Sequence, residues 1–201
     1  MAEPKLSAGR AGTPSDDLVF MGPPGAGKGT QAALLKETTG WTHLSTGDLF
    51  RQHLRLGTDL GRLARLYIDK GDYVPDDVTV GMVRDFIRER PADECVMFDG
   101  FPRTVAQAIE LDRLLEDKGR RIGRVLMLEV PRDELERRMI NRAKREGRSD
   151  DTPDVIRRRF DVYEEQTRPV LEHYEKRGLV RRVPATGSVE DVNVRLREAA
   201  L

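Results

Sequence analysis

A glycine-rich run surrounds Lys28 and has the spacing of a phosphate-binding loop: Gly22-Pro23-Pro24-Gly25-Ala26-Gly27-Lys28-Gly29-Thr30. It follows the apolar residues 18–21 and precedes a helical pattern. In such a turn the backbone N–H groups surround an anion, because glycines leave room for its close approach. The helix start adds the positive end of its dipole, and Lys28 adds a mobile cation. Position 29 is glycine rather than Ser or Thr, and the hydroxyl comes one place later at Thr30. The sequence nevertheless predicts phosphate binding here.

Arginines elsewhere in the chain could hold a second phosphate group. Arg103 follows the apolar run 95–98 and a short turn, so it should lie at the carboxyl end of a parallel strand, where open α/β sheets bind ligands. Its planar guanidinium can hold a phosphate through two hydrogen bonds. Most of the 28 arginines could equally be solvated surface residues. Only their position along the chain can therefore distinguish a phosphate ligand from a surface residue. A second candidate group, in which the first two share a helix face, is Arg138, Arg142, Arg148 and Arg159.

Strands and helices alternate along the chain in the hydrophobic pattern. Short apolar runs predict strands at 18–21, 42–44, 95–98, 124–130 and 180–183. Helices are expected at 27–38, 48–56, 59–70, 76–90, 104–118, 131–145, 153–177 and from 188 onward, with Pro169 interrupting or kinking the long one. This alternation is typical of an α/β fold with a parallel sheet, which brings the glycine-rich loop and Arg103 to one edge.

The composition excludes several classes of protein. The 201 residues carry 35 basic and 35 acidic side chains, so there is no net basic excess for binding nucleic acid or a membrane surface. No apolar run approaches the roughly 20 residues that span a bilayer. Cys95 is the only cysteine, which excludes an internal disulfide and a cysteine-cluster zinc site and fits a reducing, cytoplasmic location. Residues 1–17 lack the apolar core of a signal peptide and are expected to form a disordered extension.

Five segments match, in order, the motifs of the adenylate kinases: GPPGAGKGTQA at 22–32, STGDLFR at 45–51, GDYVPD at 71–76, FDGFPR at 98–103 with Gln107, and GRSDD at 147–151. The chain resembles that family over essentially residues 18–199. The resemblance implies an α/β P-loop nucleotide kinase, in which a central parallel five-stranded sheet is flanked by helices. It further implies a core domain (18–44, 75–137 and 152–201), a small helical insert that binds the nucleoside monophosphate (45–74) and a short lid (138–151).

The same resemblance implies roles for individual residues. The residues expected to bind ATP are Gly25, Ala26, Gly27, Lys28, Gly29, Thr30, Arg138, Arg142 and Gly187. Those expected to bind AMP are Thr46, Arg51, Asp72, Tyr73, Val74, Gly100, Phe101, Pro102, Arg103, Gln107, Arg148 and Arg159. The expected catalytic residues, which would stabilise the transferred phosphoryl group, are Lys28, Arg103, Arg138, Arg148 and Arg159. Asp48 and Asp99 would hold Mg²⁺ through its water shell.

The implied reaction is the reversible transfer of a phosphoryl group from ATP to AMP, which gives two ADP, with closure of the lid and the insert. Thr46 and Gln107 favour AMP, since the related uridylate/cytidylate kinases have Ala and Asn at these places. Gln107 also fits the capping box of a helix that begins at Thr104, which gives it a structural role as well. A UMP/CMP kinase and a P-loop protein that senses nucleotide without turnover are the alternatives. The resemblance suggests a monomer, and the short lid lacks the inserted domain that holds zinc in longer relatives, so no structural zinc is expected.

Overall fold

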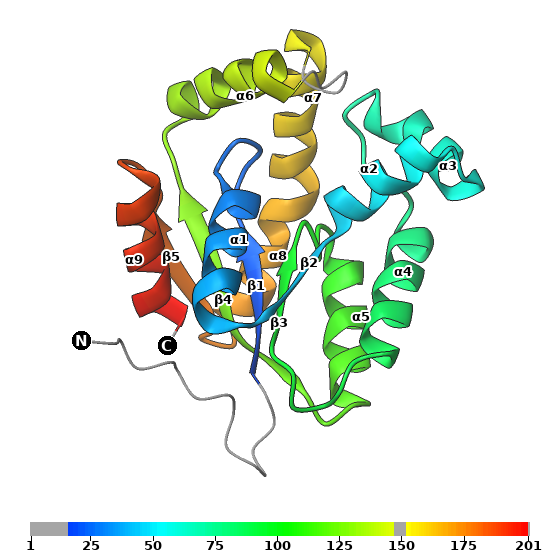
Figure 1. Ribbon diagram of the computed structural model, residues 1–201, viewed down its shortest axis with the longest axis vertical. Coiled ribbons are helices and arrows are strands. Elements are labelled where there is room, and N and C mark those ends of the chain that lie inside the picture. The colour runs from blue at the N-terminus through cyan, green and yellow to red at the C-terminus, as the bar shows by residue number, and fades with distance from the viewer. Residues whose placement is uncertain (1–15, 147–151, 201) are drawn as a thin grey trace.

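The computed structural model describes residues 16–146 and 152–200 (Figure 1). The strands are β1 (Asp16–Met21), β2 (Thr42–Ser45), β3 (Val96–Asp99), β4 (Arg121–Glu129) and β5 (Val180–Pro184). The helices are α1 (Lys28–Thr39), α2 (Thr46–Leu56), α3 (Asp59–Ile68), α4 (Asp76–Arg88), α5 (Val105–Glu116), α6 (Arg132–Glu146), α7 (Pro153–Val162), α8 (Arg168–Glu175) and α9 (Val189–Ala200). A π-helical turn, η1 (Tyr163–Thr167), lies between α7 and α8. None of the helices in the described ranges is both long and apolar enough to cross a bilayer.

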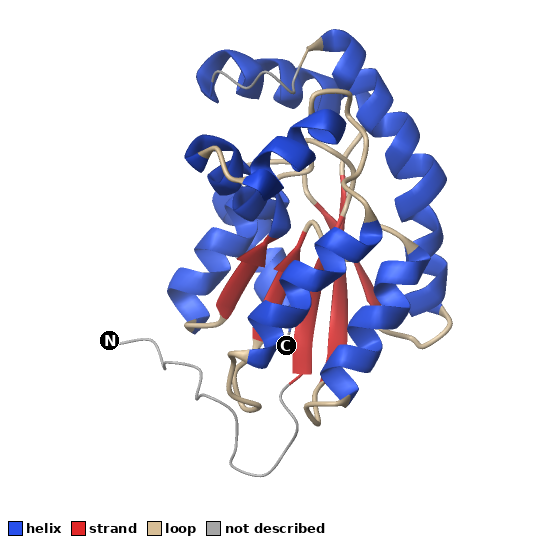
Figure 2. Ribbon diagram, turned by 90° about the vertical axis from the view of Figure 1, so that its right-hand side faces the viewer, coloured by secondary structure: helices blue, strands red, loops and turns tan. Residues whose placement is uncertain are grey.

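The five strands form one sheet in the order β2-β3-β1-β4-β5, and all neighbouring pairs are parallel. This confirms the predicted five-stranded parallel sheet. Helices cover both faces of the sheet (Figure 2), as right-handed crossovers between parallel strands require. One face packs against α4, α5 and α8, and the other against α1, α6, α7 and α9.

The central strand β1 shows why both faces of the sheet are apolar. Successive side chains of a strand point to opposite faces. Leu18 and Phe20 therefore join the hydrophobic cluster under α1 and α9, whereas Val19 and Met21 join the cluster under α4, α5 and α8. All four side chains are almost completely buried. The continuous apolar run thus reflects a strand covered on both sides, which is what the sequence predicted.

Two strands begin earlier than expected. β1 begins at Asp16 rather than residue 18, so the extension expected at 1–17 was wrong for its last two residues. The reason is that Asp17 is buried and paired, which the surrounding polar sequence does not indicate. β4 begins at Arg121 rather than residue 124, because its first residues pair with the start of β1.

The helix expected at 153–177 is divided into α7, the π-helical turn and α8, which confirms the predicted interruption near Pro169. Proline has no N–H and cannot bond to the preceding helical turn. The N–H of Arg168 instead reaches the carbonyl oxygen of Tyr163, five residues back. The turn widens the helix where it faces Arg103, in the segment that follows β3.

Helices α2 and α3 form a small unit beside the carboxyl edge of the sheet (Figure 1). Ser45 caps α2 by accepting a hydrogen bond from the N–H of Asp48, and Thr58 caps α3 in the same way through the N–H of Gly61. The unit has its own apolar cluster around Phe50, Ala64 and Val74, separate from the two main clusters.

A buried ion pair lies at the opposite, amino-terminal edge of the sheet. Both side chains, Asp17 and Arg120, are fully buried. The Arg120 Nε donates to Asp17 Oδ2 at 3.0 Å, and the N–H of Val96 donates to Asp17 Oδ1 at 2.7 Å. Burial raises the pKa of the Asp17 carboxyl, and Arg120 opposes this rise. The pair thereby joins the starts of β1, β3 and β4.

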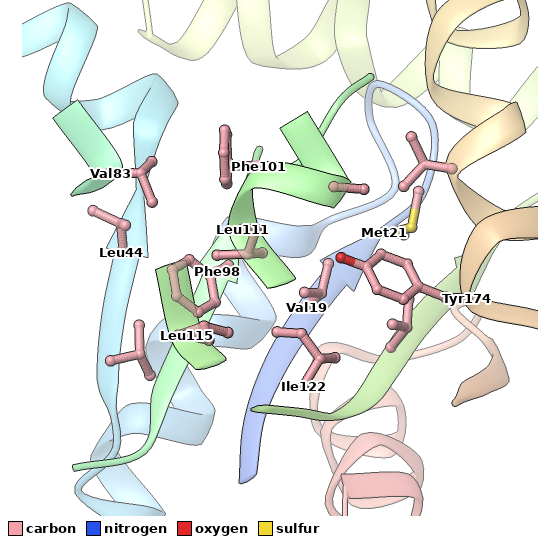
Figure 3. Close-up of a cluster of buried hydrophobic side chains, with 14 of the residues drawn as sticks. Val19, Met21, Leu44, Val83, Phe98, Phe101, Leu111, Leu115, Ile122 and Tyr174 are labelled. Carbon is pink, nitrogen blue, oxygen red and sulfur yellow. The ribbon is translucent and has the colours of Figure 1, made fainter. Parts of the chain in front are cut away.

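Tyr174 places a hydroxyl inside the main hydrophobic cluster, beside Val19, Met21 and Ile122 (Figure 3). The side chain is fully buried, and its oxygen forms no hydrogen bond with any described residue. A buried hydroxyl without a hydrogen-bond partner lowers the stability of the folded protein, compared with a phenylalanine ring at the same position. The hydroxyl is therefore a destabilising feature of an otherwise apolar cluster.

The variant Tyr174→Phe is expected to increase the free energy of unfolding by about 1 kcal/mol, because it removes the unpaired hydroxyl and keeps the ring. Urea unfolding followed by circular dichroism measures the change. The matched control is Tyr163→Phe, since the Tyr163 hydroxyl donates to the sulfur of Met127 and its loss should not stabilise the protein. A clear loss of stability in Tyr174→Phe would contradict the prediction.

Candidate active site

The glycine-rich loop runs from the end of β1 to the start of α1, as the motif predicts. Gly22, Gly25 and Gly27 have positive φ angles of 145°, 85° and 94°. A Cβ at Gly25 would also lie 2.9 Å from the carbonyl oxygen of Leu135 in α6. Glycine is therefore required at position 25 for two reasons: its positive φ angle and its close contact with the backbone of Leu135. The loop is anchored by a hydrogen bond of 3.1 Å from the N–H of Ala26 to the carbonyl oxygen of Pro23.

Lys28 folds back over this loop. Its Nζ donates to the carbonyl oxygens of Gly22 and Pro23 at 2.6 and 3.1 Å. Burial, together with the nearby cations of the site, lowers the pKa of Lys28 to about 8, although the charge of Asp99 opposes this shift. A phosphate chain in the loop would replace the two carbonyl oxygens with stronger, charged acceptors.

A pocket of about 730 Å³, here called the loop pocket, opens over the glycine-rich loop. All nine residues expected to bind ATP line it: Gly25, Ala26, Gly27, Lys28, Gly29, Thr30, Arg138, Arg142 and Gly187. They come from the loop and α1, from α6, and from the segment between β5 and α9. Residues far apart in the sequence thus enclose one anion-binding space.

Arg138 is held in place on the loop pocket by two contacts. Its Nε donates to Glu134 Oε1 at 2.8 Å, one helical turn earlier in α6. Its Nη2 donates to the carbonyl oxygen of Ala185 at 3.0 Å, so the guanidinium joins α6 to the end of β5. Partial burial lowers the pKa of Arg138 from its ordinary value, but the group remains cationic.

A second pocket of about 720 Å³, here called the insert pocket, lies between α2, α3 and the carboxyl edge of the sheet. Nine of the residues expected to bind AMP line it: Thr46, Arg51, Asp72, Tyr73, Val74, Gly100, Arg103, Gln107 and Arg159. Phe101 does not, because it is buried in the main cluster. Pro102 lines only a smaller cavity of about 60 Å³ behind the glycine-rich loop. Arg148 lies outside the described residues.

Gln107 and Thr46 both take part in hydrogen bonds within the protein. Gln107 Oε1 accepts from the N–H of Arg103, and its Nε2 donates to Asp76 Oδ1, both at 2.7 Å. Thr46 Oγ1 donates to the carbonyl oxygen of Gly100 at 2.9 Å. The Gln107 amide therefore uses one hydrogen and one lone pair and keeps one of each for a ligand. These bonds fix its orientation in the pocket.

Arg103 lies at the turn after β3. Its Nε donates to the carbonyl oxygen of Gly100 at 2.7 Å, and its guanidinium stacks over the ring of Tyr73 at 4.8 Å. The carbonyl oxygen of Arg103 accepts a hydrogen bond of 2.9 Å from Thr167 in the π-helical turn. Both the backbone and the side chain of Arg103 are thus held by neighbours.

Two carboxylates, Asp48 and Asp99, line the loop pocket. Asp99 Oδ2 lies 3.4 Å from His43 Nε2, and Asp48 Oδ1 pairs with Arg51 Nη2 at 2.5 Å. Burial raises the pKa of Asp48, but the hydrogen bond and charge of Arg51 outweigh this and leave it below its ordinary value. An ionised carboxylate is the oxygen ligand that Mg²⁺ prefers, directly or through water, so this donor set fits the ion.

The two pockets meet at a shared boundary. Residues that line both are Gly47, Arg51, Gly100, Arg103 and Arg159. Three of them are arginines, so the boundary is cationic. A phosphate chain entering from the glycine-rich loop and one entering from the insert would meet between these guanidinium groups.

Several pocket residues were missed by the sequence analysis. In the loop pocket they include His43, Glu134, Asn141 and Arg145, and in the insert pocket Leu54, Arg55, Arg65 and Ile68. Asn141 and Arg145 follow Arg138 at helical spacing, and helix periodicity would have indicated them. His43 carries no such signal, because its proximity to Asp99 depends on the pairing of β2 with β3.

The parallel sheet, the glycine-rich loop and the two joined pockets define a P-loop nucleotide-binding protein. Comparison with known proteins narrows this class. A profile of the adenylate kinase family matches residues 20–179. Adenylate kinases of Thermus thermophilus and Kocuria rhizophila are 48% and 50% identical to this chain over 182 residues. That alignment covers 90% of this chain and 95% and 97% of the relatives, respectively. The chain belongs to the adenylate kinase family of phosphotransferases.

Proposed function

We propose that the protein catalyses the reversible, Mg²⁺-dependent transfer of the γ-phosphoryl group of ATP to AMP, giving two ADP. The observation that carries the proposal is the shared arginine boundary between the loop pocket and the insert pocket. Phosphoryl transfer needs a donor and an acceptor held in line, with neutralisation of the charge on the transferred group. Two pockets that open onto common guanidinium groups provide this arrangement.

In this proposal the glycine-rich loop and Lys28 hold the phosphates of ATP, and Arg138 and Arg142 line the ATP side. Arg103 and Arg51 hold the phosphate of AMP from the other side of the boundary. Arg159 lies at the boundary itself and would stabilise the group in transit. Arg148, which lies outside the described residues, is proposed to act there as well.

Mg²⁺ would neutralise charge on the phosphate oxygens and orient the ATP phosphates. Asp99 and Asp48 are the residues proposed to hold it through water. We retain the prediction that the protein needs no structural zinc. Within residues 16–146 and 152–200 there is no cluster of three or more His, Cys, Asp or Glu side chains suited to a metal ion.

We further propose that residues 45–74 act as the acceptor-binding insert and residues 138–151 as a short lid, with the rest of residues 18–201 as the core. The separate apolar cluster around Phe50, Ala64 and Val74 supports this division, because Leu49 is the only apolar side chain of residues 45–74 that packs against a main cluster. Closure would exclude water and favour transfer over hydrolysis of ATP.

A monomer in the cytoplasm is the proposed working state. Size-exclusion chromatography with light scattering tests the monomer, because a dimer would double the measured mass.

The acceptor is expected to be AMP, since Thr46 and an oriented Gln107 line the insert pocket. Purified protein with ATP and Mg²⁺ should form ADP with AMP at a rate at least tenfold above that with UMP or CMP, a factor that about one well-placed hydrogen bond supplies. A coupled spectrophotometric assay measures each rate. The absence of AMP-dependent ADP formation would refute the proposed function. A preference for UMP or CMP would instead identify the protein as a UMP/CMP kinase.

A further inference from the structure

We propose that Thr167 is a positioning residue for the acceptor phosphate, because it holds Arg103 and Tyr73 in a fixed relation to one another. The inference rests on the proposed function for its meaning, but it has its own readout. Thr167 lies in the π-helical turn η1, more than sixty residues from either partner in the sequence. Neither the glycine-rich loop nor the arginine pattern points to it.

The hydrogen bonds of Thr167 have a defined direction. Its Oγ1 lies 2.9 Å from the carbonyl oxygen of Arg103 and 2.8 Å from the hydroxyl oxygen of Tyr73. A carbonyl oxygen can only accept, so the single hydrogen of the Thr167 hydroxyl goes to Arg103. The Tyr73 hydroxyl must then donate to Thr167. The threonine is 5% exposed, so water competes little for these bonds.

The two partners of Thr167 also touch each other. The guanidinium of Arg103 stacks on the ring of Tyr73 at 4.8 Å, a geometry in which the ring face attracts the cation. Thr167 therefore fixes the backbone that carries Arg103 and the ring on which its guanidinium rests. Loss of the hydroxyl would release both at once.

This network lies next to the reacting groups. A cavity of about 60 Å³ behind the glycine-rich loop is lined by Thr167 and Tyr73 together with the cationic side chains Lys28, Arg103 and Arg159. A shift of about 1 Å in a phosphate-holding guanidinium is enough to impair transfer strongly. Thr167 is thus close enough to the phosphate-holding side chains to affect their position. It acts only through Arg103 and Tyr73, which line the insert pocket.

The π-helical turn explains why a threonine reaches this place. Pro169 cannot donate a hydrogen bond, and the N–H of Arg168 bonds five residues back to Tyr163. The helix therefore widens over the turn that ends at Thr167. Such turns occur often at functional sites. Here the turn faces the segment after β3 that carries Arg103.

A second connection between the same parts of the chain is weaker. Arg158 in α7 pairs with Asp72 at 2.7 Å, but both side chains are substantially exposed, at 48% and 34%. Exposed ion pairs contribute little because water and salt screen them. The buried hydrogen bonds of Thr167 therefore do more than the exposed ion pair to hold residues 72 and 73 in position relative to the π-helical turn.

The experiment compares Thr167→Val, which keeps the shape of the side chain and removes both hydrogen bonds, with Thr167→Ser, which keeps the hydroxyl. For Thr167→Val we expect the KM for AMP to rise about tenfold, with the KM for ATP changed less than about twofold. For Thr167→Ser the KM for AMP should stay within about threefold of wild type. Tyr73→Phe, which retains the ring, should lie between the two. Thr38→Val, at an exposed site near the end of α1, is the matched control and should change neither KM.

A second measurement separates this inference from the proposed function. Calorimetric titration with AMP alone should show a dissociation constant about tenfold higher for Thr167→Val than for wild type. If wild type binds AMP but forms no ADP, the proposed function fails while the titration still decides the role of Thr167. A purely structural role would lower kcat through loss of folded protein and leave the KM and the dissociation constant unchanged. That result, equal loss in the serine variant, or no binding of AMP by wild type would overturn the inference.

Discussion

Replacement of Lys28 by methionine should reduce kcat for phosphoryl transfer about 10³-fold while the protein remains folded. Methionine has a similar length and no charge, so the variant removes the cation and preserves much of the packing. In the structure the Lys28 Nζ already lies over the loop, bonded to the carbonyl oxygens of Gly22 and Pro23. It is thus placed to follow charge that develops on the transferred group. The loss of one such preorganised donor typically costs two to three orders of magnitude, roughly 10²–10³ in rate.

The control for this variant is Lys36→Met, which removes the same charge from the exposed last turn of α1. Its kcat should equal that of wild type. Initial rates with ATP, Mg²⁺ and AMP, together with circular dichroism spectra of all three proteins, complete the test. A Lys28→Met enzyme within tenfold of wild type would contradict the role assigned to the lysine.

The same lysine gives a pH dependence whose sign follows from its pKa. Burial lowers the pKa of Lys28 to about 8 in the free protein, so the cation is present below that pH and is lost above it. We therefore expect kcat/KM for ATP to fall as the pH rises through about 8. Bound phosphate stabilises the cation and raises the pKa, so kcat itself should fall only at higher pH.

The second large effect concerns stability. The variant Arg120→Met should lower the free energy of unfolding by about 3–5 kcal/mol at pH 8, because it leaves the fully buried Asp17 carboxylate without its counter-charge. Asp17 also accepts the N–H of Val96, so a movement of this carboxyl would disturb three strands. Chemical unfolding followed by circular dichroism measures the loss.

The deficit of Arg120→Met should become smaller as the pH falls. Without Arg120 only the hydrogen bond from Val96 still opposes the burial that raises the pKa of Asp17, so the folded variant takes up a proton at a pH where the unfolded chain remains ionised. Folding of the variant is then favoured by acid, and its stability approaches that of wild type. The pH profile distinguishes a lost charge partner from lost packing, which would give a constant deficit.

The neighbouring residue supplies a matched control. The chain neighbours of the buried pair, Arg121 and Asp16, form an ion pair of their own, but their side chains are 65% and 44% exposed. Arg121→Met should leave the midpoint of unfolding close to that of wild type, because an exposed pair is solvated in the folded and unfolded chain alike. The double variant Asp17→Asn, Arg120→Met should recover part of the loss, since it removes both charges and keeps an acceptor for Val96. Equal effects of Arg120→Met and Arg121→Met would refute the argument.

Much of the fold could be predicted because its causes are local. The apolar runs, the glycine-rich loop and the capping residue Thr104 act over a few residues, and the strands and helices appear within a few residues of where those signals place them. The glycine-rich loop was recognisable for the same reason. Its glycines adopt the positive φ angles that the local turn requires.

The remaining features depend on contacts between distant residues. Asp17 looked like part of a polar extension, yet it meets Arg120 more than a hundred residues later in the fully buried pair. The same holds for Thr167, whose partners Tyr73 and Arg103 lie on other elements. Local patterns identify which residues can do chemistry, whereas three-dimensional packing determines which of them are held in position.

The parallel strands all point their carboxyl ends toward the two pockets, so β1 enters the sheet at the opposite edge. Helix α9 runs back from the end of β5 and finishes near that same edge (Figure 1). Both Asp16 and Ala200 therefore lie on the side of the molecule away from the two pockets. A solid support or a fluorescent reporter attached at Asp16 or at Ala200 would leave the openings of the two pockets uncovered.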